Sequence, residues 1–217
     1  MKSRKLAVWL LVGVFSVAAA FGQEMGITAK VGTLGVGGDV TLTFGGDLNL
    51  RGGYNWFSYD HTADLNEAEL DGTVEMGTFP ILLDWHCFGG GFRLSGGVVV
   101  NNNEVKLTSQ PGTVLELDGQ PFRVDSVDGR VTFDDYAPYA GFGYGNALSK
   151  DGRWNFACDF GVLFQGEPKA EATAKASDPR AQSALDRALQ AEIVDYQEDI
   201  KNFAYWPVIS IGLSYRF

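Results

Sequence analysis

The chain has 217 residues, a formal net charge of −10 at pH 7, 28 glycines and 13% aromatic residues. Such an acidic protein is a poor candidate for nucleic-acid binding, because phosphates are bound by Lys and Arg. The spacing of the two cysteines is not typical of a metal site, and we expect no metal and no cofactor. Beyond the N-terminal segment no apolar run is long enough for a transmembrane helix, so any membrane span must consist of strands.

The N-terminal segment has the pattern of a secretory signal peptide. Three positive charges lie in the first five residues, and the apolar run that follows, Leu6 to Val17, is short for a membrane span. Ala20 and Gly22 have the spacing of a signal-peptidase site. We therefore expect residues 1–22 to be a cleaved signal peptide and residues 23–217 to be the mature barrel domain. The alternative, a retained membrane anchor, is disfavoured by the short run and its small-residue end.

Eight stretches of the mature chain alternate between apolar residues and polar or small ones. This period of two is typical of β-strands, whose successive side chains point to opposite faces. In chain order the stretches are 27–33, 36–44, 48–56, 78–85, 92–100, 136–144, 154–164 and 205–217. In an outer-membrane barrel the apolar face contacts lipid and the polar face lines the lumen. The alternative for residues 27–44 is one long bent strand.

The last stretch alternates almost without error from Tyr205 and stops on the aromatic Phe217. Leu213 shares its apolar face, whereas Ser214 lies on the small and polar face. Outer-membrane barrels usually end in this way. We expect the β-barrel assembly machinery to bind Tyr215 and Phe217 as an assembly signal, and we place the C-terminus on the periplasmic side.

The breaks between stretches are of two lengths. Short ones fall at residues 45–46, 86–91 and 147–152, and longer ones at 61–70, 104–132 and 168–202. Barrels of this class have short periplasmic turns and long external loops. The sequence therefore predicts an all-β fold, an eight-stranded antiparallel transmembrane β-barrel with a helical external loop.

Two of the long breaks have patterns of their own. Residues 113–133 alternate around Asp118–Gly119, which predicts an external hairpin. Residues 179–203 repeat apolar side chains such as Leu185 and Leu189 every three or four positions, which predicts a helix. We expect the helix over the barrel mouth or on the outer surface, either as a solvated helix or as one that binds a partner.

Charged residues occupy inward positions of the predicted strands. They are Lys30, Asp39, Arg51, Asp84, Arg93, Asp159 and Arg216. An isolated buried charge is costly, so we expect these residues to pair with one another or to contact water. An eight-stranded barrel is just wide enough for its own side chains to fill it, which favours a structural network. The alternative is a polar path for small zwitterions or cations.

Residues with catalytic chemistry are few. His61 lies close in sequence to Ser58, Asp60 and Asp64, which is the composition of a lipid-facing hydrolase site. Proximity within one loop is weak support without a nucleophile–base geometry. The sequence therefore predicts no catalytic residues, and we expect a protein that is not an enzyme.

The C-terminal half resembles the CarO-type outer-membrane proteins. The segments that carry the resemblance are 136–143, 154–164 with 166–169, and 205–208 with the closing strand. Residues 124–131 and the acidic helical loop are also similar. Those proteins are eight-stranded barrels described as porins for ornithine or other basic amino acids and linked to carbapenem entry. The resemblance implies the same fold but carries no defined binding motif onto this chain.

Together these observations predict an exported protein of the cell outer membrane whose partners are lipid and the assembly machinery. Two functions remain open. One is a narrow channel for small solutes such as basic amino acids, which the resemblance favours. The other is a non-conducting structural or surface-interaction barrel. Fold alone does not decide between them.

Overall fold

The structure is a computed structural model that describes residues 24–217, apart from 66–67, 110, 118 and 150–151. The predicted signal peptide and its cleavage site lie outside the described residues. Within the described part of the chain, no helix is both long enough and apolar enough to cross a membrane.

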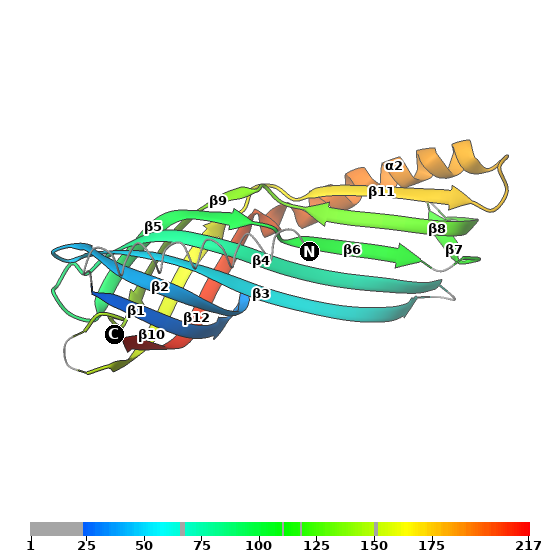
Figure 1. Ribbon diagram of the computed structural model, residues 1–217. Coiled ribbons are helices and arrows are strands. Elements are labelled where there is room, and N and C mark those ends of the chain that lie inside the picture. Colours follow the sequence, from blue (N-terminus) through cyan, green and yellow to red (C-terminus); the bar gives the residue numbers. More distant parts are fainter. Residues whose placement is uncertain (1–23, 66–67, 110, 118, 150–151) are drawn as a thin grey trace.

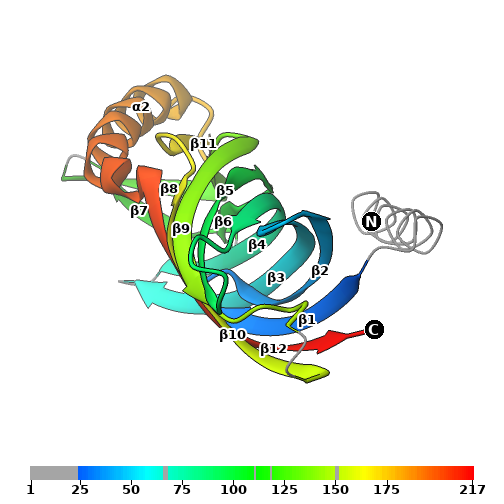
Figure 2. The ribbon, with the colours of Figure 1, turned by 90° about the vertical axis from the view of Figure 1, so that its left-hand side faces the viewer.

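Eight antiparallel strands close into a barrel (Figures 1 and 2). They are β1 (Met25–Gly32), β2 (Gly35–Gly45), β3 (Leu48–Leu65), β4 (Ala68–Trp85), β5 (Phe92–Asn101), β9 (Tyr136–Tyr144), β10 (Trp154–Phe164) and β12 (Tyr205–Arg216). The barrel closes where β1 pairs with β12, with Gly26 opposite Arg216 and Gly32 opposite Ser210. The predicted eight-stranded barrel is confirmed, and residues 27–44 form two strands.

The two ends of the barrel differ. The three short turns lie at one end, which we call the turn end, together with the last residue of β12 (Figure 1). At the other end, the extended end, β3 and β4 continue far beyond their neighbours. β4 pairs with β5 through Thr78–Trp85 and then with β6 (Glu104–Ser109) through Leu70–Glu75.

An extension of the sheet therefore grows from the extended end. The order β4–β6–β8–β11 adds β8 (Gln120–Thr132) and β11 (Lys169–Ala176), and β7 (Val114–Leu117) pairs with β8 in the predicted hairpin. Of the breaks expected to be loops, residues 104–132 are thus largely sheet, and residues 168–202 contribute the single strand β11. Residues 61–70 also belong to the sheet, because β3 and β4 keep the period of two almost to their connection.

The predicted helix is α2 (Gln182–Asp199), and it is followed by the short helix η1 (Ile200–Ala204). Leu185 and Leu189 are buried against Val127 of β8 and Ala174 of β11. Small alanine side chains on β11 let the helix approach closely. The view into the turn end shows α2 to one side of the barrel and not across its mouth (Figure 2). The helix is therefore part of the extension.

Aromatic pairs mark the height of the apolar outer surface. Trp154 and Tyr215 have ring centroids 5.0 Å apart at the turn end, and Phe164 and Tyr205 have centroids 5.7 Å apart at the extended end. The ten residue-to-residue steps of β10 from Trp154 to Phe164 span about 33 Å along the strand. With a strand tilt of about 40°, the band is about 25 Å tall, which is the usual height of the apolar band of a membrane barrel.

Candidate functional site in the barrel lumen

Arg51 is the centre of an ion-pair network in the lumen. From β3 its Nε lies 2.9 Å from an Asp84 oxygen on β4, and its Nη1 lies 3.0 Å from Asp159 Oδ2 on β10. The same Nη1 lies 3.5 Å from Asp39 Oδ2 on β2. These three carboxylates belong to three different strands. The guanidinium therefore ties β3 to two adjacent strands and, across the lumen, to β10.

Two further cations complete the network. Arg93 on β5 places Nη2 2.7 Å from Asp159 Oδ1 and donates to the backbone oxygen of Gly145. Lys30 on β1 places Nζ 2.8 Å from Asp39 Oδ2. The network then contains three cations and three carboxylates, so it is neutral overall. Its side chains are at most 11% exposed, which separates them from bulk solvent.

Hydroxyl groups satisfy more of the carboxylate oxygens. Ser95 Oγ donates to Asp84 Oδ1 at 2.6 Å, and Ser210 Oγ donates to Asp159 Oδ2 at 3.3 Å. Buried charges of this kind are stable only when they are paired and hydrogen-bonded. The arrangement has the properties of a structural cross-link, and every member is held by at least one partner.

Arg216 is the one predicted lumen charge that the structure leaves outside the network. It lies on the inward face of β12 near the turn end, and the ion pairs found among the described residues do not include it. Tyr215 points outward and packs against Phe217 with ring centroids 5.2 Å apart. The two aromatics of the predicted assembly signal therefore lie together on the outer surface.

A second layer of the lumen is apolar, and the sequence analysis did not predict it. Towards the extended end the inward positions hold buried apolar residues that form one cluster. Its members are Leu34, Met76, Leu82, Val99, Ala137, Tyr139, Leu163 and Val208. The signal was present in the sequence, because Leu82, Val99 and Leu163 stand at inward positions of their strands. The sequence analysis did not interpret these apolar residues as a layer, because the lumen of a membrane barrel is expected to be polar.

Glycines inside the barrel make room for large side chains and not for a pore. A Cβ atom at Gly161 would lie 2.5 Å from Tyr139 Oη, so the Tyr139 ring occupies the space that this glycine leaves. At Gly143 a Cβ atom would lie 3.1 Å from the Arg93 guanidinium. Both layers of the lumen are therefore packed against glycine backbone.

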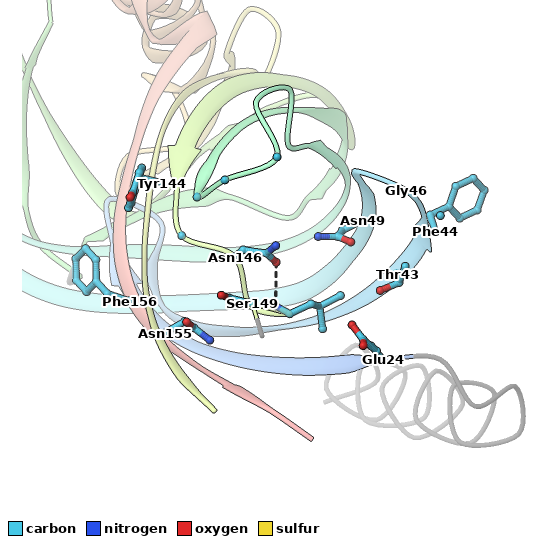
Figure 3. A pocket seen from close by; sticks show the side chains of 16 residues that line it. Glu24, Thr43, Phe44, Gly46, Asn49, Tyr144, Asn146, Ser149, Asn155 and Phe156 are labelled. Atoms are coloured by element: carbon cyan, nitrogen blue, oxygen red, sulfur yellow. Dashed lines mark hydrogen bonds between the residues drawn. The ribbon is translucent and has the colours of Figure 1, made fainter. Parts of the chain in front are cut away.

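A vestibule of about 900 Å³ opens at the turn end. Asn49, Asn146 and Asn155 are among its polar lining residues (Figure 3). The β9–β10 turn enters it: Leu148 is buried, and its backbone N–H donates to Asn146 Oδ1 at 2.9 Å. Beyond the vestibule, the space around the network shrinks to about 20 Å³. This volume holds about one water molecule.

The structure does not assemble the hydrolase constellation suggested by residues 58–64. His61 is exposed on β3 and stacks on Tyr59, with ring centroids 6.1 Å apart. Ser58 and Asp60 alternate with His61 along the strand, so they lie on the opposite face of the sheet. The side chains of residues 63–70 are not among those described.

Fold and lumen together define a class: a small eight-stranded barrel of the outer-membrane type whose interior is filled by its own side chains. The chain is similar in structure to Acinetobacter baumannii CarO2, with a TM-score of 0.58 and 23% identity over 89% of this chain and 98% of that one. It is also similar to CarO of the same organism, with a TM-score of 0.56 and 21% identity over 88% of this chain and 97% of that one.

A third structure is a major outer membrane protein from Thermus thermophilus, with a TM-score of 0.45, 12% identity and coverage of 90% and 99%. That likeness is too low to support an argument. No protein-family model and no curated protein matches the chain. The resemblance to CarO-type barrels is nevertheless confirmed for the fold, and it extends over most of the chain.

Proposed function

We propose that the protein is a non-conducting outer-membrane barrel that holds the β6–β8–β11–α2 extension on the cell surface. Three observations support a membrane location: the apolar outer face, the aromatic pairs about 25 Å apart and the fold shared with CarO. On this proposal lipid surrounds the barrel, the turn end faces the periplasm and the extension faces outward.

The observation that carries the proposal is that two consecutive layers fill the lumen. A solute that leaves the vestibule first meets the Arg51 network and then the apolar cluster around Leu163. Opening the first layer requires that buried ion pairs separate, and removing one partner from a buried pair costs about 3–5 kcal/mol. The second layer offers a polar solute no hydrogen-bond partners in exchange for its water. Both layers oppose passage by different physical means.

Swelling of proteoliposomes in an isosmotic solution tests the proposal. We expect L-lysine, glycine and a neutral sugar each to enter no faster than they enter protein-free liposomes, while the protein shows the heat-dependent gel shift of a folded barrel. Entry of L-lysine that depends on the amount of folded protein would contradict the proposal.

Surface labelling tests the orientation separately. An epitope inserted at Gly119, in the turn between β7 and β8, should bind antibody on intact cells. The matched insertion at Gly89, in the turn between β4 and β5, should bind only after permeabilisation. Both glycines have a positive φ and no neighbouring atom within 4 Å of an added Cβ, so each site has open space. The reverse pattern would show that the barrel is inserted the other way round.

A narrow channel for small solutes such as basic amino acids is the second candidate, and the vestibule favours it. The vestibule is polar and large, and Glu24 is its one charged residue among the described residues that line it. For this function the Arg51 network would have to act as a gate. Entry of L-lysine at rates well above those of glycine and the sugar would favour this candidate.

A further inference from the structure

One side of β3 has no neighbouring strand where β3 leaves the barrel. β2 begins at Gly35 and pairs with β3 only up to Trp56, which lies opposite Val36, whereas β3 continues to Leu65. Of the strands that the structure describes, β4 alone pairs with residues 57–65. The free side of β3 runs along the lower border of the extension in Figure 1. We call it the β3 edge.

The backbone groups along the β3 edge form a regular ladder of donors and acceptors. A Cβ atom added at Gly35 would collide with the Trp56 carbonyl oxygen, so this carbonyl points towards β2. The His61 carbonyl oxygen lies on the β4 side instead, 3.5 Å from the Cβ position of Gly72. Direction alternates along an antiparallel strand, so every second residue after Trp56 presents its N–H and C=O to the β3 edge. The residues with described side chains in this set are Ser58, Asp60 and Thr62.

The β3 edge lacks the features that protect most free strands. Natural sheets use Lys, Pro or a β-bulge at such edges, because unpaired backbone groups bind other strands. The other free strand of the extension, β11, has Lys169, Lys175 and a bulge after Lys175. Residues 57–65 contain no Lys, Arg, Pro or Gly, and they pair with β4 without a bulge. The β3 edge is therefore open to a further strand.

The inner face of the extension presents aromatic side chains beside the β3 edge. Phe57 lies opposite Met76 and Tyr59 lies opposite Val74, so both aromatics share the face that continues the lumen wall. They are 41% and 55% exposed, although Met76 is buried and Val74 is partly buried. A strand on the β3 edge would cover these rings with its own inward side chains. Such cross-strand contacts are favourable when the partner residue is aromatic or β-branched.

The outer face beside the β3 edge is acidic. Asp60 is exposed, and Asp71 Oδ1 on β4 accepts a hydrogen bond from Thr62 Oγ1 at 2.7 Å. The ion pairs found among the described residues include neither of these carboxylates. Lys106 on β6 shares this face, but its Nζ lies 2.6 Å from Glu75. The unpaired negative charge at the edge favours Lys or Arg on the outer face of an added strand.

We propose that the β3 edge binds an extended segment of another protein as an additional antiparallel strand. The segment alternates large apolar residues, which cover Phe57 and Tyr59, with Lys or Arg, which face Asp60. The ladder of the β3 edge selects a polypeptide, because an extended backbone offers acceptors and donors with the same spacing. Recognition of this kind takes its affinity from main-chain hydrogen bonds and its specificity from alternate side chains. Strand β11 of a second copy does not fit, because its inward alanines already pack against α2.

Fluorescence anisotropy of a labelled nine-residue peptide measures this binding on the folded protein in uncharged micelles. The probe alternates Val with Lys. We expect saturable binding that weakens as salt is added. Replacing each Lys by Glu should weaken binding about tenfold or more, since like charges then face each other. A peptide with the same Val and Lys residues in two separate blocks should also bind weakly. Equal binding of all three peptides would contradict the proposal.

Two methylated forms of the Val–Lys peptide test the backbone ladder itself. In antiparallel pairing, the residue opposite Asp60 has its side chain on the outer face and its N–H directed at β3. N-methylation of the central Lys should therefore abolish binding. N-methylation of a neighbouring Val alters a group that points away from β3 and should preserve it. The two peptides have the same composition and charge, so they enter micelles equally. Equal affinities for the protein would exclude strand addition.

Variants of β3 locate the binding site. Asp60→Pro removes an N–H that faces the β3 edge but none that bonds to β4, and edge strands tolerate Pro at such positions. It should abolish binding, while Asp60→Asn, which removes the charge alone, should weaken binding by up to about fivefold. Tyr59→Ser should also weaken it, and Tyr59→Phe should not. The heat-dependent gel shift shows that each barrel is folded. Unchanged binding by folded Asp60→Pro would place the site elsewhere and overturn the proposal.

Self-association is measured in the same micelles. Dimers that Asp60→Pro disrupts, and that the Val–Lys peptide does not displace, would show that a second copy occupies the β3 edge and would overturn the proposal. Peptide binding depends neither on conduction nor on the orientation of the barrel. Its failure is therefore distinct from a failure of the function proposed above, which the entry of L-lysine tests.

Discussion

Arg51 Nη1 and Asp159 Oδ2 lie 3.0 Å apart across the lumen, although the two residues are 108 positions apart in the chain. The pair joins β3 to β10, and these strands are not neighbours in the barrel. It therefore cross-links opposite walls and closes the space between them. Its energy depends on burial, since water would weaken the attraction between the two charges.

The first prediction concerns Arg51. Replacement by Met should lower the free energy of unfolding by about 3–5 kcal/mol, because Asp39, Asp84 and Asp159 lose their common partner while they stay buried. Urea unfolding of the refolded barrel measures the change. Lys169→Met is the matched control: its pair with Asp134 is exposed and screened by solvent, so its loss should lower the free energy of unfolding far less. Equal losses for both variants would mean that the network does not stabilise the barrel.

The second prediction concerns the outer face of β12. Leu213→Arg should destabilise the barrel in a bilayer, because the side chain would leave water for lipid, and the cost would reach about 2–4 kcal/mol if the site lies near the midplane. Val194→Arg on α2 replaces another exposed apolar residue but should change stability by no more than about 0.5 kcal/mol. The two positions are 49% and 62% exposed, so exposure alone predicts similar effects. Similar measured costs in a bilayer would place Leu213 outside lipid.

Gly161 provides a third prediction, about packing inside the lumen. Gly161→Ala should cost about 1–3 kcal/mol, since its Cβ would lie 2.5 Å from Tyr139 Oη. Gly96→Ala is the control, because its Cβ would have no described neighbour nearer than 3.8 Å. Combining Gly161→Ala with Tyr139→Leu should recover part of the loss in a double-mutant cycle. Additive costs would show that Tyr139 does not fill this space.

Deletion of Phe217 gives the fourth prediction. The deletion should reduce the amount of barrel in the outer membrane and induce the periplasmic stress response, while refolded protein unfolds at nearly the same urea concentration as the wild type. The reason is that the Phe217 ring lies on the outer surface, where it contacts Tyr215, and the residue is 64% exposed. Phe217→Tyr keeps an aromatic terminus and should assemble normally. Normal membrane levels of the deletion variant would exclude a role in assembly.

The alternation of apolar and polar residues was enough to predict the eight strands and their facing. The period of two requires only that one face contacts lipid, and Leu213 and Ser214 follow it, with 49% and 0% exposure. The extension was harder to predict. Phe57, Tyr59 and His61 alternate with polar residues, but both faces of this part of the sheet are exposed. The sequence therefore shows no clear division between a buried face and an exposed one.

The lumen could be predicted only in part. The alternation of inward and outward residues along each strand assigns Arg51 and Asp159 to the lumen. Their pairing depends on the stagger of the strands around the barrel, and this stagger cannot be inferred from the sequence of any one strand. Arg216 occupies an inward position of β12, as predicted, but it lies near the turn end, beyond the network.

The most direct test of the account is the current through planar bilayers that contain the refolded wild-type protein, Arg93→Ala or Asp84→Ala. The account predicts no channel steps in any of the three proteins, because each variant loosens only the ion-pair layer and leaves the apolar layer around Leu163 closed. Reversal potentials in a salt gradient would reveal any ion selectivity. Stable wild-type steps whose reversal potential shifts in opposite directions in Arg93→Ala and Asp84→Ala would contradict the account and show that ions pass these side chains.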